Sequence, residues 1–199
     1  MKTATKEKPI LFSGEMVRAI LAGRKTVTRR LVKIPDWADG EPFKQDNALV
    51  TTCAGSSFVR VIKPRWKAGG KLWVRETWRL GSPYEDTKLS HFNDPEEILF
   101  DHVHYKADDW DAELEGQYRP SIFMPRWASR LTLEVVGVRV ERLQELTGKE
   151  VALEGFPFSS DLDQFKQQFK QLWDKLNPVA KWDSNPWVWR VAFQPVTPA

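Results

Sequence analysis

The sequence has a single cysteine, three histidines and no long apolar run among its 199 residues. One cysteine, Cys53, excludes an internal disulfide and any zinc site built from several cysteines. No apolar stretch approaches the roughly 20 residues that cross a bilayer. Residues 1–8 are polar and rich in lysine, with no apolar stretch behind them, so we expect no secretory signal. These absences favour a cytoplasmic protein without a membrane partner.

The net charge of +3 is small but unevenly distributed. Residues 85–115 hold eleven acidic residues against two lysines, a local charge of −9 that leaves +12 for the rest of the chain. A basic body with an acidic insertion can attract a phosphate-bearing ligand. The small total charge disfavours tight binding of long nucleic acids, which draws on many phosphate contacts. Most of these carboxylates are interpreted more simply as a solvated acidic loop.

Residues 21–30, Leu-Ala-Gly-Arg-Lys-Thr-Val-Thr-Arg-Arg, concentrate reactive groups in a short segment. Ser13 predicts the N-cap of a helix that Gly23 ends, and the β-branched residues that follow predict a strand over 26–32. Such a junction can hold Lys25 close to Thr28, and a lysine near a hydroxyl can act as its base. The simpler interpretation of this segment is the exposed end of a helix, where basic residues interact favourably with the helix dipole.

The rest of the chain alternates strand patterns with a few helices. Thr147-Gly-Lys-Glu is a capping box that opens a short helix ending near Gly155, and an apolar stripe predicts a helix over 161–176. We expect strands at about 71–78, 102–106, 129–143 and 187–196. Residues 34–70 and 81–120 are interpreted as insertions, the first with at most a hairpin. From pattern alone the fold class is α+β, a barrel or half-barrel, in one domain over 1–199 with its core at about 10–33, 71–80 and 127–196.

Metal binding has little support in the sequence. His102 and His104 share a strand face at a spacing that can bind metal, but no third ligand is evident. We therefore expect neither a metal nor a cofactor.

Segment 21–30 resembles the signature of the ASCH domains, relatives of the PUA-like RNA-binding barrels, at Gly23, Lys25 and Arg30. Thr28 stands where many members have Glu. The small bacterial N(4)-acetylcytidine amidohydrolases of this superfamily also have Thr there, in a stretch similar to residues 21–28. Phage and prophage ASCH-like proteins are similar over a longer range, at 72–78, 124–130 and 185–189. The resemblance implies a PUA-like mixed β-barrel with flanking helices and two insertions.

In the amidohydrolases that the motif resembles, a lysine, a threonine and a glutamate act together. The resemblance places the first two at Lys25 and Thr28, and the third at Glu154 in the short helix after the long strand. Glu150 is the competitor, but it occupies the reach-back position of the capping box. Thr28 would attack the acyl carbonyl, Lys25 would take its proton, and Glu154 would protonate the departing cytosine amine. The simpler interpretation of Thr28 is an ordinary strand threonine, and that of Glu154 is a solvated carboxylate at a helix end.

Substrate contacts are predicted from charge and aromatic character. Arg24, Arg29 and Arg30 lie beside Lys25 in the motif and supply cations that can depress the pKa of a buried lysine. Arg24 and Arg30 are also predicted to contact the substrate. Arg75 and Glu76 interrupt an apolar strand, so one of them faces inward or lines a cleft, and Trp78 offers a flat surface for a base. A Glu76–arginine pair that only orders the fold is the competing interpretation, and most of the ten tryptophans are expected in the core.

The sequence therefore predicts an amidohydrolase that removes an acyl group from the exocyclic amine of a modified cytidine. The alternatives are a non-catalytic module that binds RNA or a modified base, and a ribonuclease. A modified nucleoside or short RNA is the expected partner. The sequence leaves the oligomeric state open, with a monomer favoured.

Overall fold

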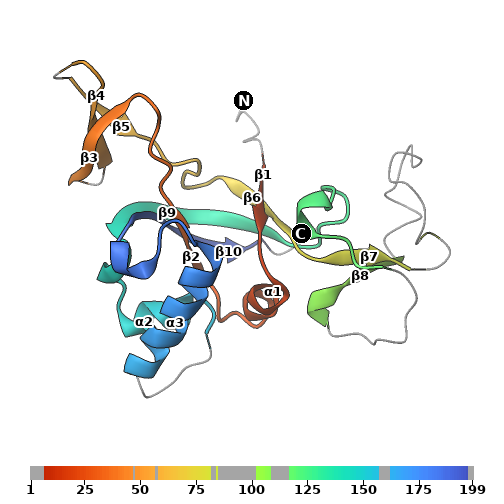
Figure 1. The fold of residues 1–199 in the computed structure, drawn as a ribbon. Coiled ribbons are helices and arrows are strands. Elements are labelled where there is room, and N and C mark those ends of the chain that lie inside the picture. Colours follow the sequence, from red (N-terminus) through yellow and green to blue (C-terminus); the bar gives the residue numbers. More distant parts are fainter. Residues whose placement is uncertain are drawn as a thin grey trace. The chain divides into compact units, whose positions relative to one another are not determined.

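The computed structural model describes most of the chain as two compact units (Figure 1). The described residues are 7–46, 48–56, 58–81, 84, 102–108, 117–156 and 162–196. The first unit comprises residues 1–23, 70–134 and 195–199, and the second comprises 24–69 and 135–194. Helices and sheets are mixed along the chain, which confirms the α+β class. Whether the whole chain is a single domain stays a prediction.

The first unit contains helix α1 and a short stretch of β-sheet. Strand β1 (Lys8–Leu11) pairs in parallel with β6 (Lys71–Arg75), which pairs antiparallel with the first residues of β9 (Thr132–Arg142). A second, two-stranded sheet joins β7 (Trp78–Leu80) to β8 (Val103–Tyr105), and β8 confirms the strand expected near 102–106. The core around this second sheet consists of Trp78, Leu80, Val103, Met124 and Ala128.

Helix α1 (Gly14–Leu21) begins and ends where the sequence predicted. The Ser13 hydroxyl accepts a hydrogen bond from the backbone N–H of Met16 at 3.4 Å, so Ser13 is the N-cap. Gly23 has φ +70°, a left-handed conformation that strongly favours glycine. The chain therefore turns sharply just before Lys25.

The second unit carries the rest of β9, followed in the sheet by β10 (Trp187–Pro195) and β2 (Val27–Leu31). Figure 1 shows α2 (Gly148–Leu153) and α3 (Leu162–Leu176) side by side next to these strands. Their apolar faces meet in a core formed by Leu143, Leu146, Val151, Phe165, Phe169, Trp173, Trp182 and Val188. The stripe on α3 is thus core, as predicted.

Residues 34–70 hold more regular structure than the sequence indicated. Strands β3 (Ala38–Gln45), β4 (Ala48–Cys53) and β5 (Val59–Ile62) form a three-stranded antiparallel sheet, so the expectation of at most a hairpin is wrong. β3 lacks the alternation of apolar and polar residues that predicts a strand, because it contains Gly40, Pro42 and several charged residues. An irregularity between Asp39 and Phe43 accommodates them, and pairing with β4 overrides the weak local preference.

The predicted barrel is not seen in the part of the chain that the structure describes, where no sheet is closed. In the second unit β2 is an edge strand, and the segment before it is instead covered by the end of α2 through a bridge between Lys25 and Glu154. Most of the acidic insertion, 81–120, lies outside the described residues. None of the described helices combines the length and apolar character that a membrane crossing needs.

Candidate functional site

Lys25 and Glu154 meet although 129 residues separate them. The N–H of Thr26 donates to the carbonyl of Leu153 at 3.0 Å, and an Arg24 guanidinium nitrogen donates to the carbonyl of Gly155 at 2.7 Å. Residues 24–26 therefore run along the end of α2. The left-handed Gly23 turns the chain into this path, and Glu154 follows the last residue of the helix.

The Lys25 amine is fully enclosed, with a side chain that is 0% exposed. Its Nζ donates to the carbonyl of Val27 at 2.9 Å, to the carbonyl of Glu154 at 2.8 Å and to Glu154 Oε2 at 2.8 Å. An ammonium group has three N–H donors, and here three oxygens receive them. The geometry therefore fits a protonated lysine paired with an ionised glutamate.

Arg29 holds the other oxygen of the Glu154 carboxylate. Its guanidinium lies 2.7 Å from Glu141, 3.1 Å from Glu150 and 3.1 Å from Glu154, and each of its three nitrogens faces a different carboxylate. The Arg29 side chain is 0% exposed, and a buried charge is tolerated only with such partners. This arrangement fixes where Glu154 lies relative to the Lys25 amine.

Two further arginines extend the network across three neighbouring strands. Arg190 on β10 lies directly opposite Arg29 on β2, and Arg139 projects from β9. Like charges in this register repel each other. Glu150 offsets the repulsion because its carboxylate contacts Arg139 at 2.6 Å and Arg190 at 3.1 Å as well as Arg29, while Glu141 contacts Arg139 at 2.7 Å. The cations of this network, one lysine and three arginines, therefore outnumber its three glutamates, and each glutamate contacts more than one cation.

This environment shifts the titration of the site. Burial lowers the pKa of the Lys25 amine, the Glu154 carboxylate raises it, and the charges of Arg30 and Arg29 lower it further, so that the net shift is downward. Burial also lowers the pKa of Arg30, against the attraction of Glu154. Burial raises the pKa of Glu150, but Arg29 and its other partners outweigh it and the net shift is downward.

The structure confirms that Glu150 has a structural role in the capping box. This role was the reason for preferring Glu154 as the catalytic carboxylate. The N–H of Thr147 donates to Glu150 Oε2 at 3.4 Å, and the capping box is present at the start of α2. Glu154, at the other end of the helix, is the carboxylate that reaches Lys25.

Thr28 lies next to this pair along the chain. It is buried at 4% exposure and sits opposite Val191 in the β2–β10 register. The Lys25 amine reaches the carbonyl of Val27, in the peptide group that precedes Thr28. Thr28 is therefore adjacent in the chain to a peptide group that the Lys25 amine contacts, and its role as a nucleophile stays a prediction.

Arg24 and Arg30, predicted as substrate contacts, also belong to the second unit. Arg24 is exposed and bound to the carbonyl of Gly155, beside Glu154. Arg30 lies opposite Trp189 in the sheet, and its charge acts on both Lys25 and Glu154. Their contact with a substrate stays a prediction.

Arg75, Glu76 and Trp78 lie in the first unit, where each has partners of its own. Arg75 stacks on Trp73 with 4.5 Å from its guanidinium carbon to the ring centre. Glu76 is 1% exposed and receives two hydrogen bonds from Arg130, at 3.0 and 3.1 Å. Burial raises the pKa of Glu76, although Arg130 opposes the shift. This pair agrees with the competing interpretation of the sequence, in which Glu76 pairs with an arginine and only orders the fold.

Trp78 does not offer the flat surface that the sequence suggested. It is 0% exposed and meets Trp127 edge-on, with ring centres 5.9 Å apart. Its ring is covered because it fills the core beside β7. We therefore correct the prediction of a base-stacking role for Trp78.

The sequence indicated Arg29 only as a cation near Lys25, and it gave no role to Glu141. The anchoring of Glu154 by Arg29 was missed, although Val27 and Arg29 share a face of β2 by their spacing of two. Glu141 is one of several charged residues in β9, and its burial at 3% exposure, which requires a cation beside it, is visible only in the structure.

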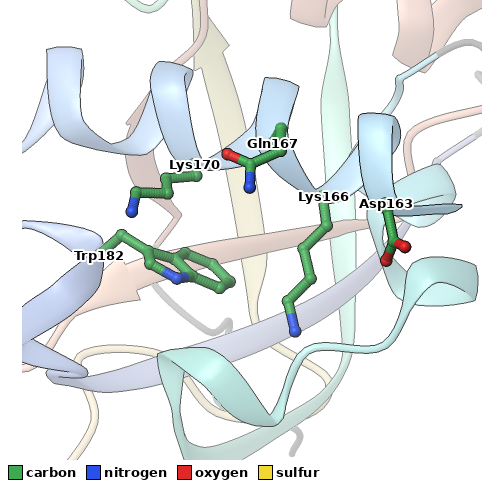
Figure 2. Close-up of a pocket in the computed structure, with 5 residues that line it drawn as sticks. All are labelled: Asp163, Lys166, Gln167, Lys170 and Trp182. Atoms are coloured by element: carbon green, nitrogen blue, oxygen red, sulfur yellow. The ribbon is translucent and has the colours of Figure 1, made fainter.

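A cavity of about 380 Å³ lies elsewhere in the second unit, on α3 (Figure 2). It is lined by Asp163, Lys166, Gln167, Lys170 and Trp182. Figure 2 shows both lysines extending past the Trp182 ring, and Lys170 pairs with Asp183 at 2.8 Å. None of the predicted catalytic residues lines it. The part of the chain that the structure describes also holds no group of three or more His, Cys, Asp or Glu side chains able to bind a metal.

No family model, curated protein or solved structure matches this chain.

Proposed function

We propose that the protein is an amidohydrolase that removes an acyl group from the exocyclic amine of a modified cytidine, as the resemblance of residues 21–30 implies. The observation that supports this best is the buried contact of 2.8 Å between Lys25 Nζ and Glu154 Oε2. In this contact the residues that the resemblance names as base and acid are within proton-transfer distance of each other, and both side chains are buried. The PUA-like fold, the cytoplasmic location and the nucleoside partner belong to the same proposal.

A buried lysine–glutamate pair can supply a base and an acid without any net change of charge. If the proton moves from Lys25 Nζ to Glu154 Oε2, the pair becomes a neutral amine and a carboxylic acid. Burial disfavours the charged form of the Lys25 amine, whose pKa is lowered. A neutral Lys25 can accept a proton from Thr28, and a protonated Glu154 can donate one to a leaving amine.

The first half of the reaction follows from that form. The Thr28 oxygen bonds to the acyl carbon as its proton passes to Lys25. The bond between the acyl carbon and the cytosine amine then breaks, and the amine takes the proton of Glu154. The cytidine leaves, an ester remains on Thr28, and Lys25 and Glu154 are again the ion pair that the geometry fits.

Water completes the cycle with the same two groups in reversed roles. Glu154 accepts a proton from the attacking water, whose oxygen bonds to the acyl carbon. Lys25 returns a proton to the departing Thr28 oxygen, and a carboxylic acid is released. The pair ends as neutral amine and carboxylic acid, ready for another substrate. Arg29 keeps the second Glu154 oxygen in place throughout.

A second candidate is a non-catalytic module that binds a modified base. The observation that favours it is the complete enclosure of the Lys25 amine, whose three donors all have acceptors. In a module of this kind the lysine has a purely structural role, which is to tie the end of α2 to the start of β2. Binding without turnover is the outcome that this candidate predicts.

The test is release of cytidine from N(4)-acetylcytidine by wild type, Thr28→Ala and Thr26→Ala. Thr26 lies two residues from Thr28 on the same segment and serves as the matched control. We expect turnover by wild type and Thr26→Ala, and its loss in a folded Thr28→Ala variant. Equal rates in the two variants would exclude Thr28 as the nucleophile. Binding of the nucleoside without turnover by wild type would favour the binding module.

A further inference from the structure

Apolar side chains are exposed on both edge strands of the sheet formed by β3, β4 and β5. Phe43 on β3 lies opposite Val50 on β4, which lies opposite Val61 on β5. Phe43 and Val61 are each 47% exposed, whereas Val50 on the central strand is buried at 4%. Side chains alternate along a strand, so Val59, 52% exposed, shares the face of Val61. The β5 edge therefore presents two exposed apolar side chains on one face.

Exposed aromatic rings lie around the same sheet. Phe58, just before β5, is 78% exposed. The Arg60 guanidinium lies over the Trp37 ring, 4.7 Å from its centre. Rings and guanidinium planes with open faces are the surfaces on which unpaired nucleobases stack.

Charge is divided between the two edges of this sheet. Residues 47–69 contain no acidic residue. They contain four basic residues, all exposed, on β5 and the segment that follows it: Arg60, Lys63, Arg65 and Lys67. The opposite edge, β3, carries Asp39, Glu41 and Lys44, and Glu41 is paired with Arg142 at 2.6 Å. The excess of positive charge therefore lies at the β5 edge, which attracts a polyanion.

The sheet is held to the strands of the second unit. Besides the contact between Glu41 and Arg142, the indole N–H of Trp187 donates to the carbonyl of Pro42 at 2.9 Å. Arg142 also lies over the Trp187 ring, at 4.2 Å. The basic edge thus has a fixed attachment through β3.

We infer that the β5 edge binds single-stranded nucleic acid, with an unpaired base on Phe58 and phosphates on Arg60, Lys63 and Lys67. A single strand combines a chain of negative charges with flat apolar faces, which matches both features of this edge. A duplex satisfies the charges but keeps its bases stacked inside. An acidic peptide satisfies the charges without the rings. This surface is distinct from the Lys25 and Thr28 site and does not depend on catalysis.

The probe is a short fluorescent oligouridylate, and its binding to the full chain is followed by anisotropy over a range of salt concentrations. We expect Phe58→Ala to weaken binding about tenfold, as the loss of one base-stacking ring does. The matched control is Phe123→Ala, which removes an exposed phenylalanine, 65% exposed, in the first unit and leaves binding unchanged.

The charge contribution is read from the salt dependence. Lys63→Gln and Lys67→Gln should each reduce the slope of log K against log salt by about 0.7, the value for one phosphate of a single strand. Lys175→Gln, at an exposed position on α3, should not change it. An unlabelled duplex of the same length should compete poorly, because its bases cannot reach the rings.

Several results would overturn the inference. Wild type that does not bind the oligouridylate at low salt excludes a single-strand surface. A Phe58→Ala variant that binds as tightly as wild type, or a duplex that competes equally well, excludes stacking. Charge variants that keep the wild-type slope place the phosphates elsewhere. Each readout is a binding measurement, so its failure is separate from failure of the amidohydrolase proposal.

Discussion

The Nζ of Lys25 lies 2.8 Å from Oε2 of Glu154, and both side chains are almost completely enclosed. Lys25 precedes β2 and Glu154 ends α2, so the contact ties together two segments that are remote in sequence. The same lysine also donates to the Glu154 carbonyl. One amine therefore fixes the backbone and the carboxylate of the residue proposed as its partner in proton transfer.

Loss of the lysine should destabilise the second unit. We expect Lys25→Ala to lower the free energy of unfolding by about 3–5 kcal/mol, because it removes one partner of a buried ion pair. Lys25→Met keeps the apolar stem and should cost less. Urea denaturation measures both. Arg24→Ala, which changes the exposed neighbour, should stay within about 0.5 kcal/mol of wild type. A Lys25→Ala variant as stable as wild type would mean that the pair does not hold the segments together.

Stability should rise with pH in the alkaline range. The pKa of Lys25 is lowered in the folded protein, so the unfolded chain binds more protons between that lowered pKa and 10.5, the ordinary value. The free energy of unfolding therefore increases as the pH rises through this window. Lys25→Met should remove this contribution. Denaturation at a series of pH values, wild type beside the variant, measures it, and identical slopes would contradict the shift.

The pH dependence of activity should respond to Arg30. The active pair holds one proton, as a neutral Lys25 and a protonated Glu154, so kcat/KM falls as the pH rises through the lowered pKa of Lys25 and that proton is lost. The Arg30 charge contributes to this lowering. We expect Arg30→Gln to raise the pKa of Lys25 and to shift the falling limb to higher pH. A limb that stays in place, with only its height changed, would assign it to another group.

Arg29 should act as a positioning residue. Arg29→Lys offers one compact charge in place of a planar fork that contacts Glu141, Glu150 and Glu154. Glu154 would lose its second anchor, and we expect kcat to fall about a hundredfold with little change in KM. Arg139→Lys, at a position 51% exposed, is the control and should retain most of the activity. An unchanged kcat in a folded Arg29→Lys variant would reduce the network to a structural role.

Trp78 should behave as a core residue rather than a substrate contact. Because it is 0% exposed, Trp78→Ala should cost about 3–5 kcal/mol of stability through the cavity it leaves. The milder Trp78→Phe should retain the wild-type KM for the nucleoside. A raised KM in that variant, with kcat and stability preserved, would restore Trp78 as a binding residue.

Local signals were read correctly from the sequence where a single segment decides the outcome. Ser13 and Gly23 set the ends of α1, and the capping box at Thr147 assigns Glu150 to the helix start. That assignment left Glu154 as the candidate partner of Lys25, although nothing local indicates how the two approach each other.

Features that depend on pairing between distant segments were not predictable in the same way. β3 contains Gly40 and Pro42, and it is a strand because β4 lies beside it. Arg29 joins the site because three carboxylates from β9 and α2 meet it. The enclosure of Trp78 likewise follows from side chains that pack on it from later in the sequence, such as Met124 and Trp127.

The most direct test is a single-turnover experiment with wild-type protein in excess over N(4)-acetylcytidine, quenched over time and followed by chromatography and peptide mass spectrometry. The account predicts release of cytidine and an acetyl group transiently bound to the peptide that contains Thr28. Bound nucleoside that remains intact would contradict the amidohydrolase proposal. Cytidine release that persists unchanged in Thr28→Ala would contradict the assignment of the nucleophile.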